Sequence, residues 1–494
     1  EAAPRRDAMS RAVTTLLRKR GLLAAATSPE VDAVARDWGA GPLAASHPRP
    51  GAYIGFDPTA SSLHLGSMVQ LVALWHLRRA GFKPIALVGT ATGQIGDPSG
   101  KSEDRALLQH DELASNAAGV RSCIEQVLAH IEARALAVHA EHAATYDDLA
   151  EGGPLLPPDM CPAPDNASSG GASTAVEVAE NAPFYEGMSA LGLLRDVGQH
   201  FRLGTMLGRE SVRARLQSPA GLSFTEFSYQ LLQAWDFREL RRSRGCVLQM
   251  GGSDQWGNIT AGVDLVRRVD AADVFGVTAP LLTTASGAKL GKTEGNAVWL
   301  TADRTSHFAL YQYCMRMSDA DAAPLLRRLS LLPLSACEEI ERAHAARPES
   351  GALQRALATE VVTMSRGAAA AATAQAVTAA LFGGKGGAAE SPAADVAADI
   401  SAAALAGEVP CAVVEPGALA GSQARDLAVA AGVAESKAQV TRLIKGGGVA
   451  AGARRLTPDR TTVEAADMMA PGLAVLRLGK SKPFVALERP SDRS

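Results

Sequence analysis

Apolar residues along the first third of the chain follow two alternating patterns. Residues 52–56 and 83–89 are short apolar runs, the second closed by a glycine, as expected for buried parallel strands. Between them, residues 66–80 carry apolar side chains at helical spacing and end at Gly81, a position typical of a helix C-cap. The order strand, helix, strand predicts a right-handed parallel α/β unit.

Two stretches of biased composition interrupt this pattern. From Gly152 to about Ala175, prolines, glycines and serines accumulate, a composition that cannot bury a core. We therefore expect a disordered insertion over about residues 151–178. Alanine and glycine dominate residues 367–420, which we interpret as a linker region. Alanine permits helix there, so only the glycine-rich residues 383–387 are expected to be flexible throughout.

The end of the chain has its own pattern and its own charge. Residues 473–478 and 484–487 are expected strands of a small, separate α/β module. Residues 421–494 hold 12 Lys/Arg against 7 Asp/Glu, a balance of +5, whereas the whole chain has a formal charge of -3. The remainder therefore carries -8, and the positive end is the natural place for a nucleic acid.

Composition excludes some classes of protein. The chain is 47% apolar and 20% charged, as in globular proteins, and no run approaches the roughly 18 apolar residues that a membrane span needs. The cysteines are scattered without metal-ligand spacing and are expected to be free thiols in a reducing compartment. They are Cys123, Cys161, Cys246, Cys314, Cys337 and Cys411.

The first residues are rich in arginine. Arg5, Arg6, Arg11 and Arg18 outnumber the acids, as near the end of a transit peptide, although a truncated sequence explains the same residues equally well. The expected compartment is the mitochondrial matrix or chloroplast stroma in a eukaryote, and otherwise the cytoplasm.

Four polar, mostly glycine-rich segments carry the candidate chemistry. Residues 53–67 lie where a strand ends and a helix begins, and there Thr59 and His64 can add donors to a phosphate site. Residues 92–105 form a glycine-rich loop with two cations, and residues 249–258 follow another short strand. Residues 289–293 place two lysines and a threonine on a fourth loop. Each signal alone is weak, because a lone histidine is more often structural and paired loop lysines are usually solvated.

Together the segments resemble the two signatures of class I aminoacyl-tRNA synthetases. His64-Leu-Gly-Ser67 is similar to the H-I-G-H element, except that its last position is serine, and Lys289-Leu-Gly-Lys-Thr293 is similar to the K-M-S-K-S loop. The flanking residues resemble bacterial tyrosyl-tRNA synthetases nearly residue for residue. They are Tyr53-x-Gly-Phe-Asp-Pro-Thr59, Gly96-Asp-Pro-Ser-Gly100, Phe224-Thr-Glu-Phe-Ser-Tyr229 and Gly251-Gly-Ser-Asp-Gln-Trp-Gly-Asn-Ile259.

The resemblance implies a tyrosine pocket. Tyr53 and Asp236 match the pair that hydrogen-bonds the phenol hydroxyl, and Gln255 matches the residue that positions the substrate carboxylate. The positions that hold the substrate ammonium match Asp97, Tyr229 and Gln233. Without the motif, residues 229, 233 and 236 would be read as the solvated face of an amphipathic helix.

The resemblance also implies an ATP site that works by charge stabilisation, with Mg²⁺ bound to ATP and no metal held by the protein. The matching ATP-binding positions are Gly55, Asp57, His64, Gly66, Ser67, Gly251, Gly252, Asp254 and Lys292. The catalytic donors expected at the breaking phosphate bond are Thr59, His64, Lys101, Arg105, Lys289, Lys292 and Thr293.

The C-terminal segment resembles an S4-type RNA-binding domain, which implies tRNA(Tyr) as its partner. The basic positions that fit phosphates are Lys437, Arg442, Lys445, Arg454 and Arg455. On charge alone an ordinary charged helix face is favoured, because +5 over 74 residues is modest, and the family resemblance favours tRNA instead.

The expected architecture is α/β. It has a Rossmann-like parallel-sheet catalytic domain at residues 10–285, a helical domain at 286–366, the linker at 367–420 and the S4-like module at 421–494. By resemblance the enzyme is a homodimer that takes L-tyrosine, ATP and tRNA(Tyr), with no membrane partner.

Two alternatives stay open at this point. A synthetase relative that has lost catalysis and serves as an RNA-binding protein would keep the fold; the intact His64 and Lys289 argue against it, and Ser67 argues mildly for it. A tryptophanyl-tRNA synthetase shares the fold and both signatures. The pair Tyr53 and Asp236 favours tyrosine over tryptophan.

Overall fold

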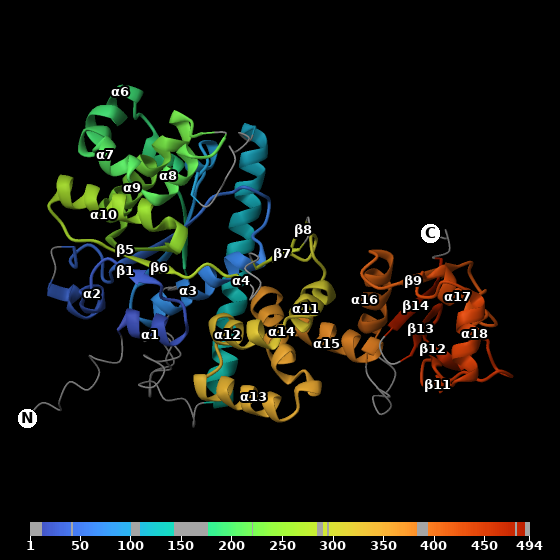
Figure 1. The fold of residues 1–494 in the computed structure, drawn as a ribbon. Helices are drawn as coiled ribbons and strands as arrows, with labels where there is room; N and C mark the ends of the chain where they lie inside the picture. Colours follow the sequence, from blue (N-terminus) through green and yellow to red (C-terminus); the bar gives the residue numbers. More distant parts are fainter. Residues whose placement is uncertain are drawn as a thin grey trace, which may run out of the picture. The chain divides into compact units, whose positions relative to one another are not determined.

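The computed structural model describes residues 12–40, 43–99, 109–142, 176–219, 221–283, 290–293, 296–382, 394–479 and 482–489. The chain divides into two compact units, which are coloured along the sequence in Figure 1. Unit 1 combines Glu1–Thr301 with Met317–Arg366, and unit 2 combines Ala302–Arg316 with Gly367–Ser494. The chain therefore passes between the units more than once.

Unit 1 is built on a six-stranded sheet in which every strand but one is parallel to its neighbours. The exception is β1, which pairs with β6 in antiparallel fashion. In sheet order the strands are β1 (Ala25–Ala26), β6 (Phe275–Ala279), β5 (Cys246–Gly252), β2 (Gly51–Phe56), β3 (Lys83–Val88) and β4 (Glu177–Glu180). The predicted parallel strands at residues 52–56 and 83–89 are confirmed as β2 and β3.

Helices cover both faces of this sheet. Figure 1 shows α9 and α10 on one side of the strands and α1 and α3 on the other. The predicted helix at residues 66–80 is α3, and Gly81 follows it with φ +95°, a conformation that favours glycine. The described α-helices that precede β6 in the sequence are α1 (Val13–Lys19), α2 (Val31–Asp37), α3 (Met68–Arg79), α4 (His110–His142), α6 (Ala190–Gly192), α7 (Leu203–Leu207), α8 (Glu210–Leu216), α9 (Phe224–Arg244) and α10 (Trp256–Asp270).

Helix α9 has sharply defined ends. The Ser223 hydroxyl accepts a hydrogen bond from the backbone N–H of Glu226, and the helix ends at Gly245, which is left-handed with φ +64°. These caps fix where the helix begins and ends, and thus which side chains it turns toward the strand ends of β2 and β5.

Three further helices complete unit 1: α12 (Asp319–Leu329), α13 (Leu334–Ala346) and α14 (Ala352–Arg366). Helix α14 packs along α4, where Arg134 forms an ion pair of 2.7 Å with the buried Glu360. These helices belong to the same unit as the sheet, whereas α11 (His307–Met315) belongs to unit 2.

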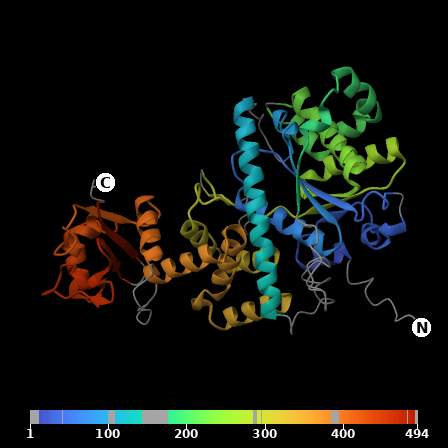
Figure 2. The ribbon, with the colours of Figure 1, turned by 180° about the vertical axis from the view of Figure 1, so that it is seen from behind.

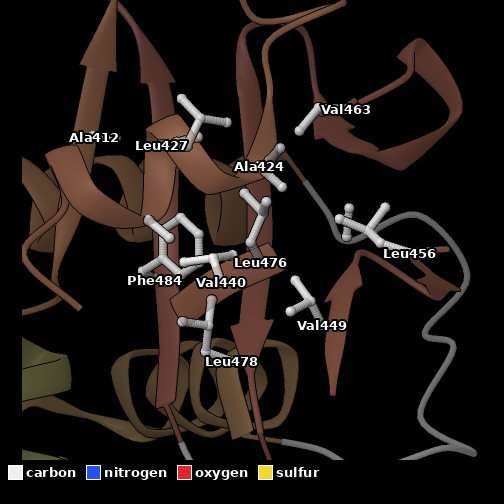
Figure 3. Close-up of a cluster of buried hydrophobic side chains, with 14 of the residues drawn as sticks. Ala412, Ala424, Leu427, Val440, Val449, Leu456, Val463, Leu476, Leu478 and Phe484 are labelled. Carbon is white, nitrogen blue, oxygen red and sulfur yellow. The ribbon is translucent and has the colours of Figure 1, made fainter. Parts of the chain in front are cut away.

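Unit 2 contains a second sheet. Its strands run in the order β11 (Arg454–Arg455), β10 (Val449–Ala451), β13 (Leu473–Leu478), β14 (Lys482–Glu488) and β9 (Cys411–Val414), with β12 (Met468–Ala470) also paired to β13. The predicted C-terminal strands are confirmed as β13 and β14. Figure 3 shows part of the core that this sheet shares with α17 (Ala424–Ala430) and α18 (Lys437–Lys445), including Val440, Leu476 and Phe484.

The interpretation of residues 367–420 as a linker is wrong for the parts that the structure describes. They form α15 (Ala368–Phe382), α16 (Ala394–Leu405) and strand β9. Val377, Leu381 and Ile400 are fully buried in a cluster with Val475 and Val485 of the sheet. Alanine has the highest helix propensity, so occasional large apolar residues suffice to anchor these helices. The glycine-rich residues 383–387 lie outside the described residues.

Most of the predicted insertion at residues 151–178 also lies outside the described residues, and its last two positions belong to β4. The described cysteines are free thiols; Cys161 is not among them. None of the helices described is long and apolar enough to cross a membrane. From behind, Figure 2 shows the long helix α4 beside the strands of the unit 1 sheet.

Candidate active site

A cavity of about 560 Å³ opens at the carboxyl ends of the parallel strands in unit 1. Residues from all four polar segments line it, through Tyr53 and Ser67, Thr92 and Asp97, Gly251 and Gln255, and Leu290. Ligands of open α/β sheets bind at such strand ends, as the sequence patterns predicted. Helix α9 adds a wall from a distant part of the chain.

Most of the predicted site residues lie together around this cavity. Those that line it are Tyr53, Gly55, Asp57, Thr59, His64, Gly66, Ser67, Asp97, Tyr229, Gln233, Asp236, Gly251, Gly252, Asp254 and Gln255. Lys101, Arg105 and Lys289 lie outside the described residues. Lys292 and Thr293 form the short strand β7 (Lys292–Thr293), and only their backbone is described.

One part of the cavity wall carries a hydroxyl next to a carboxyl. Tyr53 is fully buried, and its hydroxyl has no hydrogen-bond partner among the described residues. Asp236 is 3% exposed, and its two oxygens accept hydrogen bonds from Asn181 Nδ2 at 2.9 Å and from the Tyr185 hydroxyl at 2.8 Å. A buried hydroxyl without a partner costs free energy, which a ligand with a hydrogen-bonding group would recover.

Burial dominates the electrostatics of this corner. It raises the pKa of Asp236 to about 8, against the lowering effect of the bonds from Asn181 and Tyr185. Burial, and then the charge of Asp236, raises the pKa of Tyr53 well above its usual range, so its hydroxyl keeps its proton. The corner therefore offers one O–H donor and, in either protonation state of Asp236, an acceptor oxygen.

Two residues of this network, Asn181 and Tyr185, were not predicted. Asn181 accepts a bond from the backbone N–H of Ala91 at 2.8 Å and donates to Thr92 Oγ1 at 3.0 Å as well as to Asp236. Tyr185 lies in a short turn after β4. A polar residue directly after a strand could have indicated Asn181 as a site residue. However, β4 has only four residues and adjoins the compositionally biased stretch, so the strand itself was not predicted.

Two carboxylates lie further along the cavity. The Tyr229 hydroxyl donates to Asp57 Oδ2 at 2.8 Å. Asp97 accepts from Gln255 Nε2 at 2.5 Å and from Asn258 Nδ2 at 3.3 Å. Two acids lining the same space suit a cationic group, and their partners hold them in place.

The α9 side chains therefore do not form a solvated face. Tyr229 is 6% and Asp236 3% exposed, and Gln233 lines the same cavity. The four-residue spacing between Tyr229 and Gln233 places them on one side of the helix, facing the strand ends.

The motif His64-Leu-Gly-Ser67 is in direct contact with the segment around Lys292. His64 forms an antiparallel bridge with Trp299, and the backbone N–H of Leu65 donates to the carbonyl of Val298 at 2.7 Å. Gly291 has φ +80°, and a Cβ there would lie 3.0 Å from the backbone nitrogen of Gly66. The two signatures thus meet through a pair of glycines that leaves no room for side chains.

Comparison with known proteins agrees with this geometry. The sequence model of the family described as tRNA synthetases class I (W and Y) matches residues 45–383. The tyrosine–tRNA ligase of Rhodopirellula baltica is 40% identical over 431 residues, covering 87% of this chain and 88% of the relative. That of Streptomyces coelicolor is 39% identical over 474 residues, covering 96% and 97%.

Solved structures agree as well. The chain resembles a C-terminally truncated mitochondrial tyrosyl-tRNA synthetase of Aspergillus nidulans with a TM-score of 0.59 and 28% identity, over 74% of this chain and 92% of that one. The corresponding enzyme of Coccidioides posadasii gives 0.54 and 29%, over 74% and 90%.

The chain belongs to the class I aminoacyl-tRNA synthetases of the tryptophan and tyrosine group. Within that group its activity is tyrosine–tRNA ligation: it activates L-tyrosine with ATP and transfers the tyrosyl group to tRNA(Tyr). The alternative of a tryptophan enzyme does not fit these relatives, which are tyrosine–tRNA ligases.

Proposed function

We propose that the corner formed by Tyr53 and Asp236 binds the phenol hydroxyl of tyrosine. The Tyr53 O–H donates to the substrate oxygen, and the substrate O–H donates to an oxygen of Asp236. The single observation that carries this assignment is the fully buried Tyr53 hydroxyl with no partner among the described residues, beside a buried carboxyl. The test is equilibrium binding of tyrosine and phenylalanine to the protein, in which equal affinities would refute it.

The amino-acid end of the substrate then extends toward the two carboxylates. Asp97, Tyr229 and Gln233 hold the ammonium, and Gln255 positions the carboxylate. The hydrogen bond from Gln255 to Asp97 supports this arrangement, because it keeps the residues for the two substrate groups adjacent. The substrate carboxylate is ionised near neutral pH and needs no general base.

Activation joins a carboxylate oxygen of tyrosine to the α-phosphorus of ATP while the bond to pyrophosphate breaks. Negative charge grows on the phosphate oxygens, and donors stabilise it. Adenosine and ribose pass along Gly55, Asp57, Gly251, Gly252 and Asp254, and the three glycines, which lack a Cβ atom, admit a close approach. The donors are Thr59, His64, Lys101, Arg105, Lys289, Lys292 and Thr293, with Mg²⁺ entering on ATP.

A variant at His64 tests the assignment of charge stabilisation. His64→Ala should lower kcat of tyrosine-dependent pyrophosphate exchange by about 10- to 1000-fold, with a KM for tyrosine within about twofold, because the donor acts mainly in the transition state. His110→Ala, at an exposed position at the start of α4, is the control. A His64 variant with full kcat would contradict the role.

The basic residues of unit 2 are proposed to bind tRNA. Arg442, Lys445 and Arg455 are exposed. Lys437 instead lies 2.9 Å from Asp426, and Arg454 is held by Asp467, so these two contribute less free charge. Loss of tRNA affinity in Arg442→Ala, and a smaller loss in Lys437→Ala, would support the S4-like assignment; equal losses would argue against this ranking.

A homodimer is proposed from the exposed apolar side chains that unit 1 carries on and between its short helices. Monomeric proteins rarely leave many large apolar side chains exposed within one region. Six such side chains lie between α6 and the start of α9, and they are Leu191 (79%), Leu194 (55%), Leu203 (65%), Leu207 (42%), Leu216 (50%) and Phe224 (75%). A second copy of the chain would cover them. Phe224→Lys should shift the sedimenting species from dimer to monomer, and a monomeric unaltered protein would refute the proposal.

An organellar compartment is proposed on the arginine-rich start of the chain and on the likeness to mitochondrial enzymes. Fractionation of cells that make the protein tests this, and recovery in the cytosol would refute it.

A further inference from the structure

The segment from Asn296 to Leu300, which follows Lys292, pairs with a neighbouring stretch of backbone on each of its two sides. β7 (Lys292–Thr293) pairs with β8 (Asn296–Ala297) in antiparallel fashion, and the backbone N–H of Val298 donates to the carbonyl of Gly291 at 2.9 Å. The same segment pairs with the motif around His64, because the N–H of Leu300 donates to the carbonyl of Leu63 at 2.8 Å. The segment from Asn296 to Leu300 is thus hydrogen-bonded through its backbone to both signatures.

The outer side of this strand has a third partner. In an antiparallel ladder the carbonyl of a residue in a non-hydrogen-bonded pair points away from the neighbouring strand. Trp299, opposite His64, is such a residue, and its carbonyl accepts a bond from Arg366 Nη2 at 3.0 Å. Arg366 also donates from Nε to Leu300 at 3.2 Å and from Nη2 to Thr301 at 3.3 Å.

We infer that Arg366 is a positioning residue for amino-acid activation. It is the last residue of α14, far in sequence from the cleft and not among the residues that line the cavity. Its planar guanidinium has several donors in a fixed fork, which suits three successive carbonyls in a way that one ammonium group cannot. Through Trp299 it holds His64, and through Val298 and Gly291 it holds the backbone next to Lys292.

The location of Arg366 gives this contact a second consequence. The chain leaves unit 1 directly after Thr301 and again directly after Arg366. The side chain of Arg366 therefore ties together, inside unit 1, the two points from which unit 2 is connected.

The inference rests on the proposed role of His64 and the lysine segment in charge stabilisation. If the unaltered protein showed no tyrosine-dependent pyrophosphate exchange, that role would fail first. If the unaltered protein did catalyse this pyrophosphate exchange, the Arg366 variants would test the positioning role independently of the proposed function.

The test compares Arg366→Ala and Arg366→Lys with Arg355→Ala in the full-length chain. Arg355 lies on the same helix, is exposed and also donates to a backbone carbonyl, that of Ser350, so it controls for loss of an ordinary arginine. Arg366→Ala should lower kcat of pyrophosphate exchange by about tenfold or more while the KM for tyrosine stays within about twofold, because displacement acts on the reacting groups. Arg366→Lys should keep an intermediate rate.

Amide hydrogen exchange supplies a readout that general destabilisation would not mimic. Exchange at Leu65 and Leu300 should become faster in Arg366→Ala and not in Arg355→Ala, with β2 and β5 unchanged. An unaltered kcat in Arg366→Ala would overturn the inference, and so would faster exchange throughout unit 1 with a proportional loss of folded protein. If the alanine variant does not fold, the same comparison with Arg366→Lys decides, since an unchanged kcat and unchanged local exchange there would also overturn it.

Discussion

At the scale of single residues, the proposed specificity depends on two buried groups, the hydroxyl of Tyr53 and the carboxyl of Asp236. Tyr53 has an O–H with no partner among the described residues, and Asp236 keeps acceptor capacity after two bonds from the protein. A ligand without a hydroxyl would leave the Tyr53 hydroxyl unsatisfied, and an unsatisfied buried group costs about 1–3 kcal/mol.

Removing the Tyr53 hydroxyl should relax discrimination between tyrosine and phenylalanine. Tyr53→Phe loses one bond to the substrate and removes the orphan donor, so the ratio of kcat/KM for tyrosine to that for phenylalanine should fall by about 5- to 100-fold. Pyrophosphate exchange with each amino acid measures the ratio. Tyr313→Phe, at a position that does not line the cavity, is the control, and an unchanged ratio in Tyr53→Phe would refute the pocket assignment.

The raised pKa of Asp236 predicts a pH dependence of stability. The folded protein holds this proton up to about pH 8, whereas the unfolded chain releases it near the ordinary value of 3.8. The folded state therefore binds more protons in that window, and the contribution of Asp236 to stability is lost as pH rises from about 4 to 8. Asp236→Asn should flatten this slope, by more than about 1 kcal/mol between pH 5 and 8.

Denaturant unfolding of the ligand-free protein at both pH values measures this slope. Asp111→Asn, at an exposed position in α4, provides the comparison and should leave the slope as it is. A slope in Asp236→Asn equal to that of the unaltered protein would show that the carboxyl is not buried as the structure has it.

At the scale of elements, the two signatures depend on a glycine pair. Gly291→Ala should strain the backbone by about 1–2 kcal/mol at its positive φ and also push against Gly66. Gly187 has a similar φ of +75° with nothing within 4 Å of a Cβ, so Gly187→Ala isolates the strain from the contact. We expect a larger loss of stability in Gly291→Ala than in Gly187→Ala, and a loss of pyrophosphate exchange only in Gly291→Ala; equal exchange rates in the two variants would mean that the contact with Gly66 does not matter.

The elements nearest the site were predictable from sequence because they combine two independent signals. β2 and β3 are apolar runs that end in polar, glycine-rich turns, and α3 has clear helical spacing. The contribution of β4 was hidden by its length and its neighbours, so Asn181 and Tyr185 were missed. The contact of Arg366 with Trp299 joins positions 67 residues apart, and no periodicity reports such a pairing.

Alanine-rich sequence was the main source of error in the fold. Composition suggested a linker at residues 367–420, yet α15 and α16 bury Val377, Leu381 and Ile400 against the second sheet. Helices of small residues need only a few large apolar residues to pack against a core, and the average composition of the stretch does not show where those residues lie. The spacing of single large apolar residues among the alanines was the feature that indicated packed helices.

At the scale of the whole molecule, the proposed function assigns activation to unit 1 and tRNA binding to unit 2. Phe484 is fully buried in the core of unit 2, and Phe484→Ala should destabilise that unit by about 3–5 kcal/mol. Because the cleft lies in unit 1, exchange of pyrophosphate should continue at its normal rate while charging of tRNA falls. Comparing the two assays on one preparation measures this, and a parallel loss of both would contradict the division.

The most direct measurement is the tyrosine-dependent exchange of pyrophosphate into ATP by the purified protein, run with tyrosine, phenylalanine and tryptophan. The account predicts rapid exchange with tyrosine and very little with the other two, since only tyrosine satisfies both Tyr53 and Asp236. Absence of exchange with tyrosine in folded protein, or equal exchange with phenylalanine, would contradict it.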